Sequence, residues 1–91
     1  MKSFRLTNAY KKDLKRMSRR RSYDLNLLAD VLDALRRGRQ LAVARRDHPL
    51  KGQWKGWREC HIQADWLLIY KATDTEVLLA RTGTHADLFG T

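Results

Sequence analysis

The sequence predicts a small α+β domain, in the chain order β-α-α-β-β-β, with an antiparallel sheet and two helices packed on one of its faces. Two observations lead to this fold class. Apolar residues recur at helical spacing in two segments of the first half, whereas the second half holds three short segments rich in β-formers. At 91 residues the chain is shorter than those that usually divide, so residues 1–91 are expected to form one domain.

The first half is expected to begin with a short strand over Ser3–Leu6, followed by a helix. The side chain of Thr7 or Asn8 is expected to cap the free amides at the start of this helix. Three apolar residues share one face of this helix at the spacing i, i+4, i+7: Tyr10, Leu14 and Met17. Its remaining positions make the outer face almost wholly basic: Lys11, Lys12, Lys15, Arg16, Arg19 and Arg20. A solvated surface explains many such faces, but Asp13 is the only acid here, which favours contact with a phosphate backbone.

A second helix is expected from about Ser22–Asp24 to Gly38, a residue that commonly ends helices. Its apolar stripe has the spacing i, i+3, i+7, i+10: Leu25, Leu28, Leu32 and Leu35. The link between the two helices is short, so they are expected to form a helical hairpin whose leucines belong to the core.

The second half changes period after a connector at residues 40–44. Three strands are expected, over Trp57–Ile62, Trp66–Lys71 and Glu76–Thr82, and the breaks between them are too short for crossovers. Short breaks indicate antiparallel hairpins. One further helical turn is expected over His85–Leu88.

The net charge of +9 is concentrated in one half of the chain. Residues 1–46 hold 14 Lys and Arg against 4 Asp and Glu, whereas residues 47–91 hold 5 against 6. This asymmetry favours a polyanionic partner, nucleic acid first and an acidic protein second. The longest apolar run has five residues, Trp66–Tyr70, which excludes a membrane-spanning helix. The single cysteine, Cys60, and the absence of a secretory signal pattern predict an intracellular protein with no internal disulfide.

The histidines lie in the half without excess charge, and strand parity suggests where they point. If Cys60 and Ile62 face the helices, His61 faces the open side of the sheet. An antiparallel meander would then gather five polar groups on one concave surface: His48, His61, Asp65, Arg81 and His85.

Such a set suits metal-independent cleavage of RNA. Histidines can take the 2′-hydroxyl proton and protonate the leaving oxygen, and an arginine can stabilise the phosphorane. Trp66 and Phe89 are candidates for stacking on bases, although tryptophans in small domains are commonly core residues. The histidines lack the short spacings of zinc sites, so neither a metal nor another cofactor is expected.

Three motifs occur in order in the second half: H-P-L-x-G-x-W-x-G, H-x-x-x-D-W and R-T-G-T-H-x-x-L-F. In these motifs the chain resembles the bacterial YafQ toxins of the RelE/ParE superfamily, and the order of elements in its first half agrees in pattern. The resemblance implies a RelE-like fold and a cytoplasmic toxin that cuts mRNA in the A site of the 70S ribosome. It also implies an acidic antitoxin, a heterotetramer of two toxins and two antitoxins, and contact with operator DNA only through the antitoxin.

The resemblance also implies roles for individual residues. His85 would be the general acid, His48 or Asp65 the base with the help of His61, and Arg81 the phosphate ligand. Trp66 and Phe89 would position the nucleotide, and the basic helix face would bind ribosomal RNA.

Other functions remain open at this point. A toxin of the same superfamily that binds DNA gyrase, or a basic nucleic-acid-binding module, would not need the histidines, and a metal-dependent hydrolase would lose activity with a chelator.

Overall fold

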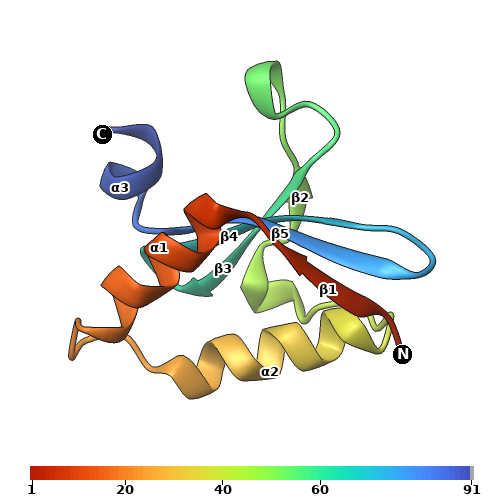
Figure 1. The fold of residues 1–91 in the computed structure, drawn as a ribbon, viewed down its shortest axis with the longest axis horizontal. Helices are drawn as coiled ribbons and strands as arrows, with labels where there is room; N and C mark the ends of the chain where they lie inside the picture. The colour runs from red at the N-terminus through yellow and green to blue at the C-terminus, as the bar shows by residue number, and fades with distance from the viewer. Residues whose placement is uncertain (91) are drawn as a thin grey trace.

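The computed structural model describes residues 1–90 as a five-stranded sheet covered by helices (Figure 1). The helices and strands in chain order are β1 (Ser3–Leu6), α1 (Asn8–Ser18), α2 (Leu25–Arg36), β2 (His48–Pro49), β3 (Arg58–Gln63), β4 (Trp66–Ala72), β5 (Glu76–Gly83) and α3 (His85–Phe89). One-turn 3-10 helices, η1 (Val43–Arg45) and η2 (Gly52–Trp54), flank β2. The predicted α+β class is confirmed, with β2 as an additional strand. Within the described residues, no helix has the length and apolar character needed to cross a membrane.

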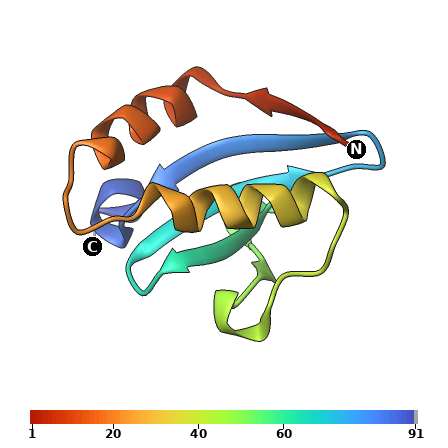
Figure 2. The ribbon, with the colours of Figure 1, turned by 90° about the horizontal axis from the view of Figure 1, so that it is seen from below.

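The sheet is mixed rather than wholly antiparallel. Its strand order is β1-β5-β4-β3-β2, and β1 runs parallel to β5, with Ser3 opposite Glu76 and Leu6 opposite Leu79. The other neighbouring pairs are antiparallel, as the short breaks predicted. The predicted antiparallel pairing was wrong for β1. The partner of this strand is β5, far along the chain, so no short hairpin connection indicates how the two strands pair (Figure 2).

Side-chain caps fix where the first two helices begin. The Thr7 hydroxyl accepts a hydrogen bond from the Tyr10 amide (2.9 Å) and donates one to the Ala80 carbonyl (2.7 Å). The cap of α1 therefore also attaches this helix to β5. Asp24 caps α2 by accepting a hydrogen bond from the Asn26 amide (2.9 Å).

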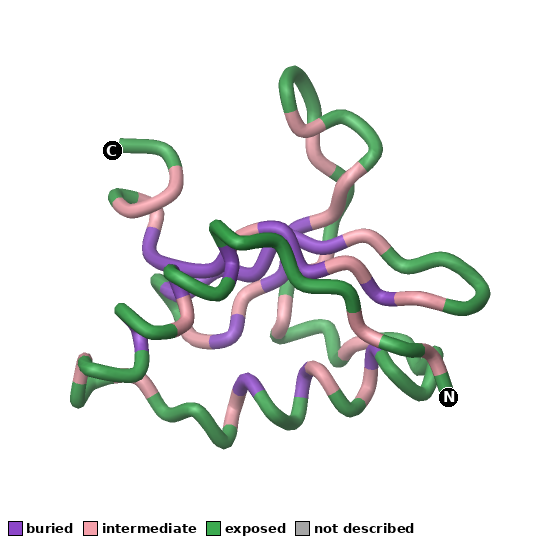
Figure 3. The backbone as a smooth tube through the Cα atoms, viewed as in Figure 1, coloured by how far each residue is buried: buried purple, intermediate pink, exposed green. Residues whose placement is uncertain are grey.

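The core lies between the helices and one face of the sheet (Figure 3). Apolar residues of both helices pack there against alternate residues of the strands: Tyr10, Met17, Leu28, Val31, Leu35, Cys60, Ile62, Trp66, Leu68, Tyr70, Val77 and Leu79. Leu25 differs from the prediction: it is the first residue of α2 and remains 42% exposed. Burial raises the pKa of the Cys60 thiol to about 12, so this cysteine is a poor nucleophile.

The opposite face of the sheet is flanked by α3 and by the loop that contains η2, which both rise away from α2 (Figure 1). The central strand, β4, contributes Leu67 and Ile69 to this face, and both side chains are fully buried. In the sheet register, Leu67 lies between His61 and Gly83, and Ile69 lies between Glu59 and Arg81. An apolar floor thus runs between the strands that carry the polar side chains.

Candidate active site

Strand parity orients the side chains of β3 as predicted. Cys60 and Ile62 are buried in the core, so Glu59 and His61 belong to the face turned away from α2. The two-residue strand β2 then places His48 directly opposite Glu59. The proline after His48 has no amide hydrogen to donate, and the residue before a proline favours extended backbone, which suits a short edge strand.

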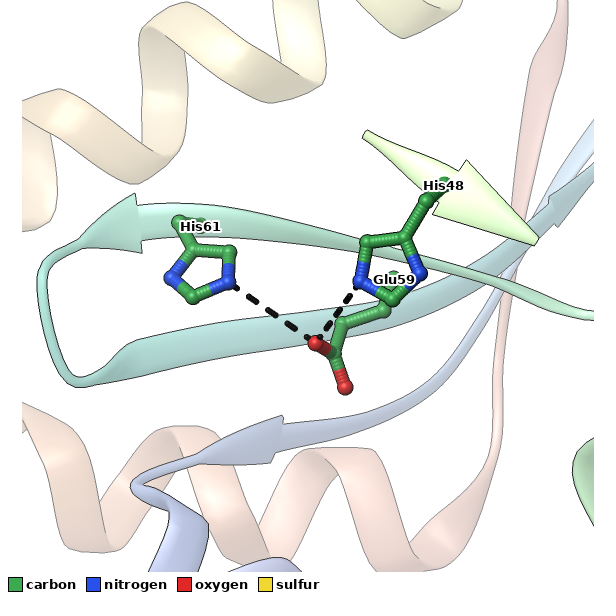
Figure 4. A group of neighbouring side chains, drawn as sticks. All are labelled: His48, Glu59 and His61. Carbon is green, nitrogen blue, oxygen red and sulfur yellow. Dashed lines mark hydrogen bonds and ion pairs between the residues drawn. The ribbon is translucent and has the colours of Figure 1, made fainter. Parts of the chain in front are cut away.

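Glu59 joins the two histidines of this part of the site (Figure 4). One of its carboxylate oxygens lies 3.2 Å from His48 Nε2 and 3.8 Å from His61 Nε2. Glu59 and His61 are largely buried, whereas about half of the His48 side chain is exposed. Glu59 was not among the predicted site residues, although its i, i+2 spacing to His61 puts both on one face of a strand.

His85 and Asp65 form a second pair of imidazole and carboxylate. Asp65 Oδ1 lies 2.8 Å from His85 Nδ1 and also accepts a hydrogen bond from the His85 amide (3.1 Å). These bonds from His85 lower the pKa of the Asp65 carboxyl. When His85 Nδ1 donates its hydrogen bond to Asp65, Nε2 is the nitrogen left for proton transfer, and 44% of the His85 side chain is exposed. The imidazole centroids of His85 and His61 are 6.1 Å apart, which brings the two pairs into one site.

A short helix carries His85 into this position. Thr84 caps α3, and its capping box is completed by the Asp87 carboxylate, which accepts a hydrogen bond from the Thr84 amide (3.1 Å). Arg20 donates two hydrogen bonds to Asp87, at 2.7 and 3.1 Å. These bonds hold the pKa of the Asp87 carboxyl well below its usual range.

Arg81 belongs to the same sheet face, since it pairs with Ile69 in β4 just as Glu59 does on the other side. Its guanidinium donates two hydrogen bonds to Asp13 of α1, from Nε (2.6 Å) and from Nη2 (3.0 Å). This bonding raises the pKa of Arg81 above its ordinary value. The predicted phosphate ligand therefore has an intramolecular partner that the sequence did not indicate.

The two aromatic candidates have different surroundings. Phe89 is 41% exposed, and its ring centroid lies 6.4 Å from that of His85, so a base can reach its face. Trp66 is fully buried: its indole donates a hydrogen bond to Thr82 Oγ1 (2.8 Å), and its ring packs edge-on against Tyr23. The assignment of Trp66 to nucleotide binding was wrong, because the first residue of β4 points into the core between sheet and helices.

The predicted basic face lies on α1 and on the two residues that follow it, and it is exposed at Lys11, Lys12, Lys15, Arg16 and Arg19. Arg20 is less available to RNA than these residues, because its side chain donates two hydrogen bonds to Asp87. Arg16 lies 3.7 Å from Asp13 and 3.9 Å from Asp87 while remaining about half exposed. Cations of the helix thus contact both acidic residues that support the site.

One group of side chains also has the arrangement of a metal site. Ligand atoms of His48, Glu59 and His61 all lie within 4.8 Å of one another. Two imidazoles and a carboxylate are ligands that Cu²⁺ and Zn²⁺ accept. No metal was predicted, because the three histidines lack the short spacings of zinc sites and Glu59 was not among the predicted site residues.

Comparison with known proteins assigns the family. The family model described as the bacterial toxin of type II toxin–antitoxin system, YafQ, matches residues 2–90. The chain belongs to this family. The mRNA interferase toxin YafQ of Escherichia coli strain K12 is 45% identical over 82 residues, covering 89% of this chain and 88% of that protein.

Solved structures of YafQ proteins and related toxins have the same fold. The E. coli DinJ–YafQ toxin–antitoxin complex contains a chain with a TM-score of 0.87 and 41% identity, and the match covers 98% of each chain. A copper-bound mutant toxin from Helicobacter pylori has a TM-score of 0.89 and 37% identity, covering 98% of this chain and 100% of that one. The RelE-like fold implied by the motifs is therefore confirmed.

Proposed function

We propose that this protein is the toxin of a type II toxin–antitoxin system and acts as a metal-independent endoribonuclease on mRNA in the ribosomal A site. The observation that carries the proposal is the pairing of two imidazole–carboxylate groups on one sheet face beside Arg81 and the exposed ring of Phe89. The YafQ family, with relatives named mRNA interferase toxins, supports the cleavage of mRNA. The toxin would act in the cytoplasm, where ribosomes translate.

The reaction begins with attack of the 2′-oxygen on the neighbouring phosphorus. The cluster of His48, Glu59 and His61 would accept the 2′-hydroxyl proton, because the Glu59 carboxylate stabilises an imidazolium next to it. His85 would then protonate the 5′-oxygen as the P–O bond breaks, leaving a 2′,3′-cyclic phosphate and a free 5′-hydroxyl. Asp65 bonds to His85 rather than to His48, so its role would be to orient the acid and not to act as the base.

Arg81 would stabilise the charge that develops on the phosphorane, and Phe89 would stack on a base of the substrate. The exposed cations of α1 would bind ribosomal RNA, because a helix face with this charge attracts phosphates irrespective of sequence. Charge reversal at Lys11 and Lys15 should weaken ribosome binding, and unchanged binding would contradict the assignment of this face.

The antitoxin would be an acidic protein, and we expect a heterotetramer of two copies of each protein, contacting operator DNA through the antitoxin. Its apolar contact would be the groove of about 490 Å³ between α1 and α2, whose lining includes Leu6 and Leu25, both exposed, and the rim residues Lys11 and Lys15. Leu6→Glu and Leu25→Glu should weaken antitoxin binding, whereas Val43→Glu, at an exposed apolar position outside the groove, should not. Equal binding by all three variants would exclude the groove.

The central experiment compares cleavage of one mRNA, free and on a programmed ribosome, by the wild-type protein and His85→Ala. Cleavage that occurs only on the ribosome, yields the cyclic phosphate and is lost in the variant would support the proposal. Adding EDTA to the free-RNA reaction tests a metal-dependent hydrolase, since ribosomes themselves need Mg²⁺. No cleavage by the folded protein in either setting would favour a gyrase-binding toxin or a plain nucleic-acid-binding module.

Cu²⁺ bound by His48, Glu59 and His61 would occupy the nitrogen atoms that the reaction needs for proton transfer. Copper should therefore inhibit cleavage, and a copper-selective chelator that leaves Mg²⁺ on the ribosome should restore it, whereas a copper-dependent enzyme would lose activity with the same chelator.

A further inference from the structure

Asp13 has an unexpected position for the one acidic residue of a basic helix. It lies in α1 among lysines and arginines, where a solvated carboxylate would be ordinary, yet its side chain is only 2% exposed. The carboxylate points toward β5 instead of toward water. A buried charge of this kind is costly unless partners replace its hydration.

The hydrogen-bond partners of Asp13 are residues of β5, the strand that ends at the active site, and Arg16 of α1 lies 3.7 Å away. Oδ2 accepts hydrogen bonds from Arg81 Nε (2.6 Å) and from the Thr82 amide (3.2 Å), and Oδ1 accepts one from Arg81 Nη2 (3.0 Å). Arg81 and Asp13 are 68 positions apart, so the contact joins α1 directly to the active-site face of the sheet.

The geometry of these bonds determines which part of Arg81 is left for a ligand. A guanidinium has five coplanar N–H groups, and a carboxylate that bonds Nε and one terminal nitrogen occupies the side edge only. The end edge, formed by Nη1 and the second hydrogen of Nη2, can still bind two oxygens of a phosphate. Within residues 1–90, Nη1 of Arg81 has no hydrogen-bond partner, and about a quarter of the side chain is exposed.

We propose that Asp13 is a positioning residue for RNA cleavage: it holds Arg81 by the side edge and leaves the end edge to the scissile phosphate. This inference rests on the ribonuclease function proposed above. A free arginine would lose rotational freedom when it binds a phosphate, whereas Arg81 is ordered before the substrate arrives. The same bonds fix α1, with its RNA-binding face, at a set distance from the reacting phosphate.

The sign of the Asp13 charge distinguishes positioning of Arg81 from simple electrostatic attraction of RNA. Asp13 is negative and lies beside the phosphate site, so its charge weakens the attraction of Arg81 for RNA. Replacing Asp13 by Asn should therefore leave KM unchanged or lower it. The same substitution should reduce kcat, because Asn has only one acceptor oxygen and its NH₂ group would face one of the N–H donors that now bond to Asp13.

The test measures kcat and KM for mRNA cleavage on programmed ribosomes. Asp13→Asn should lower kcat at least about 10-fold without raising KM. The matched control is Asp33→Asn, which removes the charge of another Asp–Arg pair, formed with Arg37 on the exposed side of α2 (3.0 Å), and should change neither constant. A folded Asp13→Asn protein with kcat within twofold of the wild type would overturn the inference. Failure of the wild-type protein to cleave would refute the proposed function itself.

A second measurement applies if Asp13→Asn does not fold. In the wild-type protein, the Arg81 Nε–H resonance, assigned with Arg81→Lys, should exchange with water much more slowly than that of the exposed Arg39. Exchange of both resonances at the same rate would mean that Asp13 does not hold Arg81.

Discussion

Replacing Arg81 by Ala should reduce stability as well as activity. The substitution removes both arginine hydrogen bonds from the buried Asp13 carboxylate. Breaking a buried ion pair by deleting one partner typically costs about 3–5 kcal/mol. The loss here should be smaller, because Arg81 is partly exposed and Asp13 keeps the Thr82 amide and Arg16 at 3.7 Å. We expect the free energy of unfolding to fall by about 2–3 kcal/mol, out of the ~5–15 kcal/mol usual for a small domain.

The assay is urea unfolding at neutral pH, followed by tryptophan fluorescence, for Arg81→Ala, Asp13→Ala and the double variant. The double variant should lose less than the sum of the single changes, because no unpaired buried charge remains when both partners are absent. Arg37→Ala is the control, since it breaks an exposed pair with Asp33 and should cost about 0.5 kcal/mol or less.

Two results would refute this reasoning. One is a loss below about 0.5 kcal/mol for Arg81→Ala, the range of an exposed pair. The other is strict additivity in the double variant. If the destabilisation is found, lost cleavage by Arg81→Ala measures folding as well as phosphate binding, and Arg81→Lys becomes the better test of the chemistry.

Three further predictions concern the aromatic residues, the short terminal helix and the glutamate of the site. Trp66→Ala should lower the free energy of unfolding by about 3–5 kcal/mol, measured by urea unfolding, whereas Phe89→Ala should lower cleavage with a change in stability below about 1 kcal/mol. Bonding to Arg20 lowers the pKa of Asp87 in the folded protein. The ionised Asp87 therefore stabilises the fold above its unfolded pKa of about 3.9, and this stabilisation is lost as the pH falls below that value. Asp87→Asn should therefore be less stable than the wild type at pH 7, with a difference that shrinks below about pH 4 in thermal melts; a constant difference would exclude this linkage. Glu59→Gln should lower single-turnover cleavage by roughly 10-fold or more, because a neutral amide stabilises an imidazolium less; an unchanged rate would remove Glu59 from the reaction.

Much of the fold follows from local patterns in the sequence. The helical spacing of the apolar residues, the cap at Thr7 and the short breaks between the last strands each act over a few residues, so they predict α1, α2 and the β3-β4-β5 meander. Alternation in β3 was enough to orient His61, because Cys60 and Ile62 needed burial. The motifs of the second half identified the family, and its model matches nearly the whole chain.

Only the tertiary structure decided the features that depend on contacts between distant residues. The parallel pairing of β1 with β5, the burial of Trp66, the pairing of His48 with Glu59 and the bond from Asp13 to Arg81 have no local signature. The physical reason is the same in each case. Residue type and spacing determine which side chains share the face of one helix or strand, whereas which faces meet is determined by how the whole chain packs. Asp13 is the clearest case: the sequence presents it as one acid among surface cations, and the packing of α1 against β5 buries it beside Arg81.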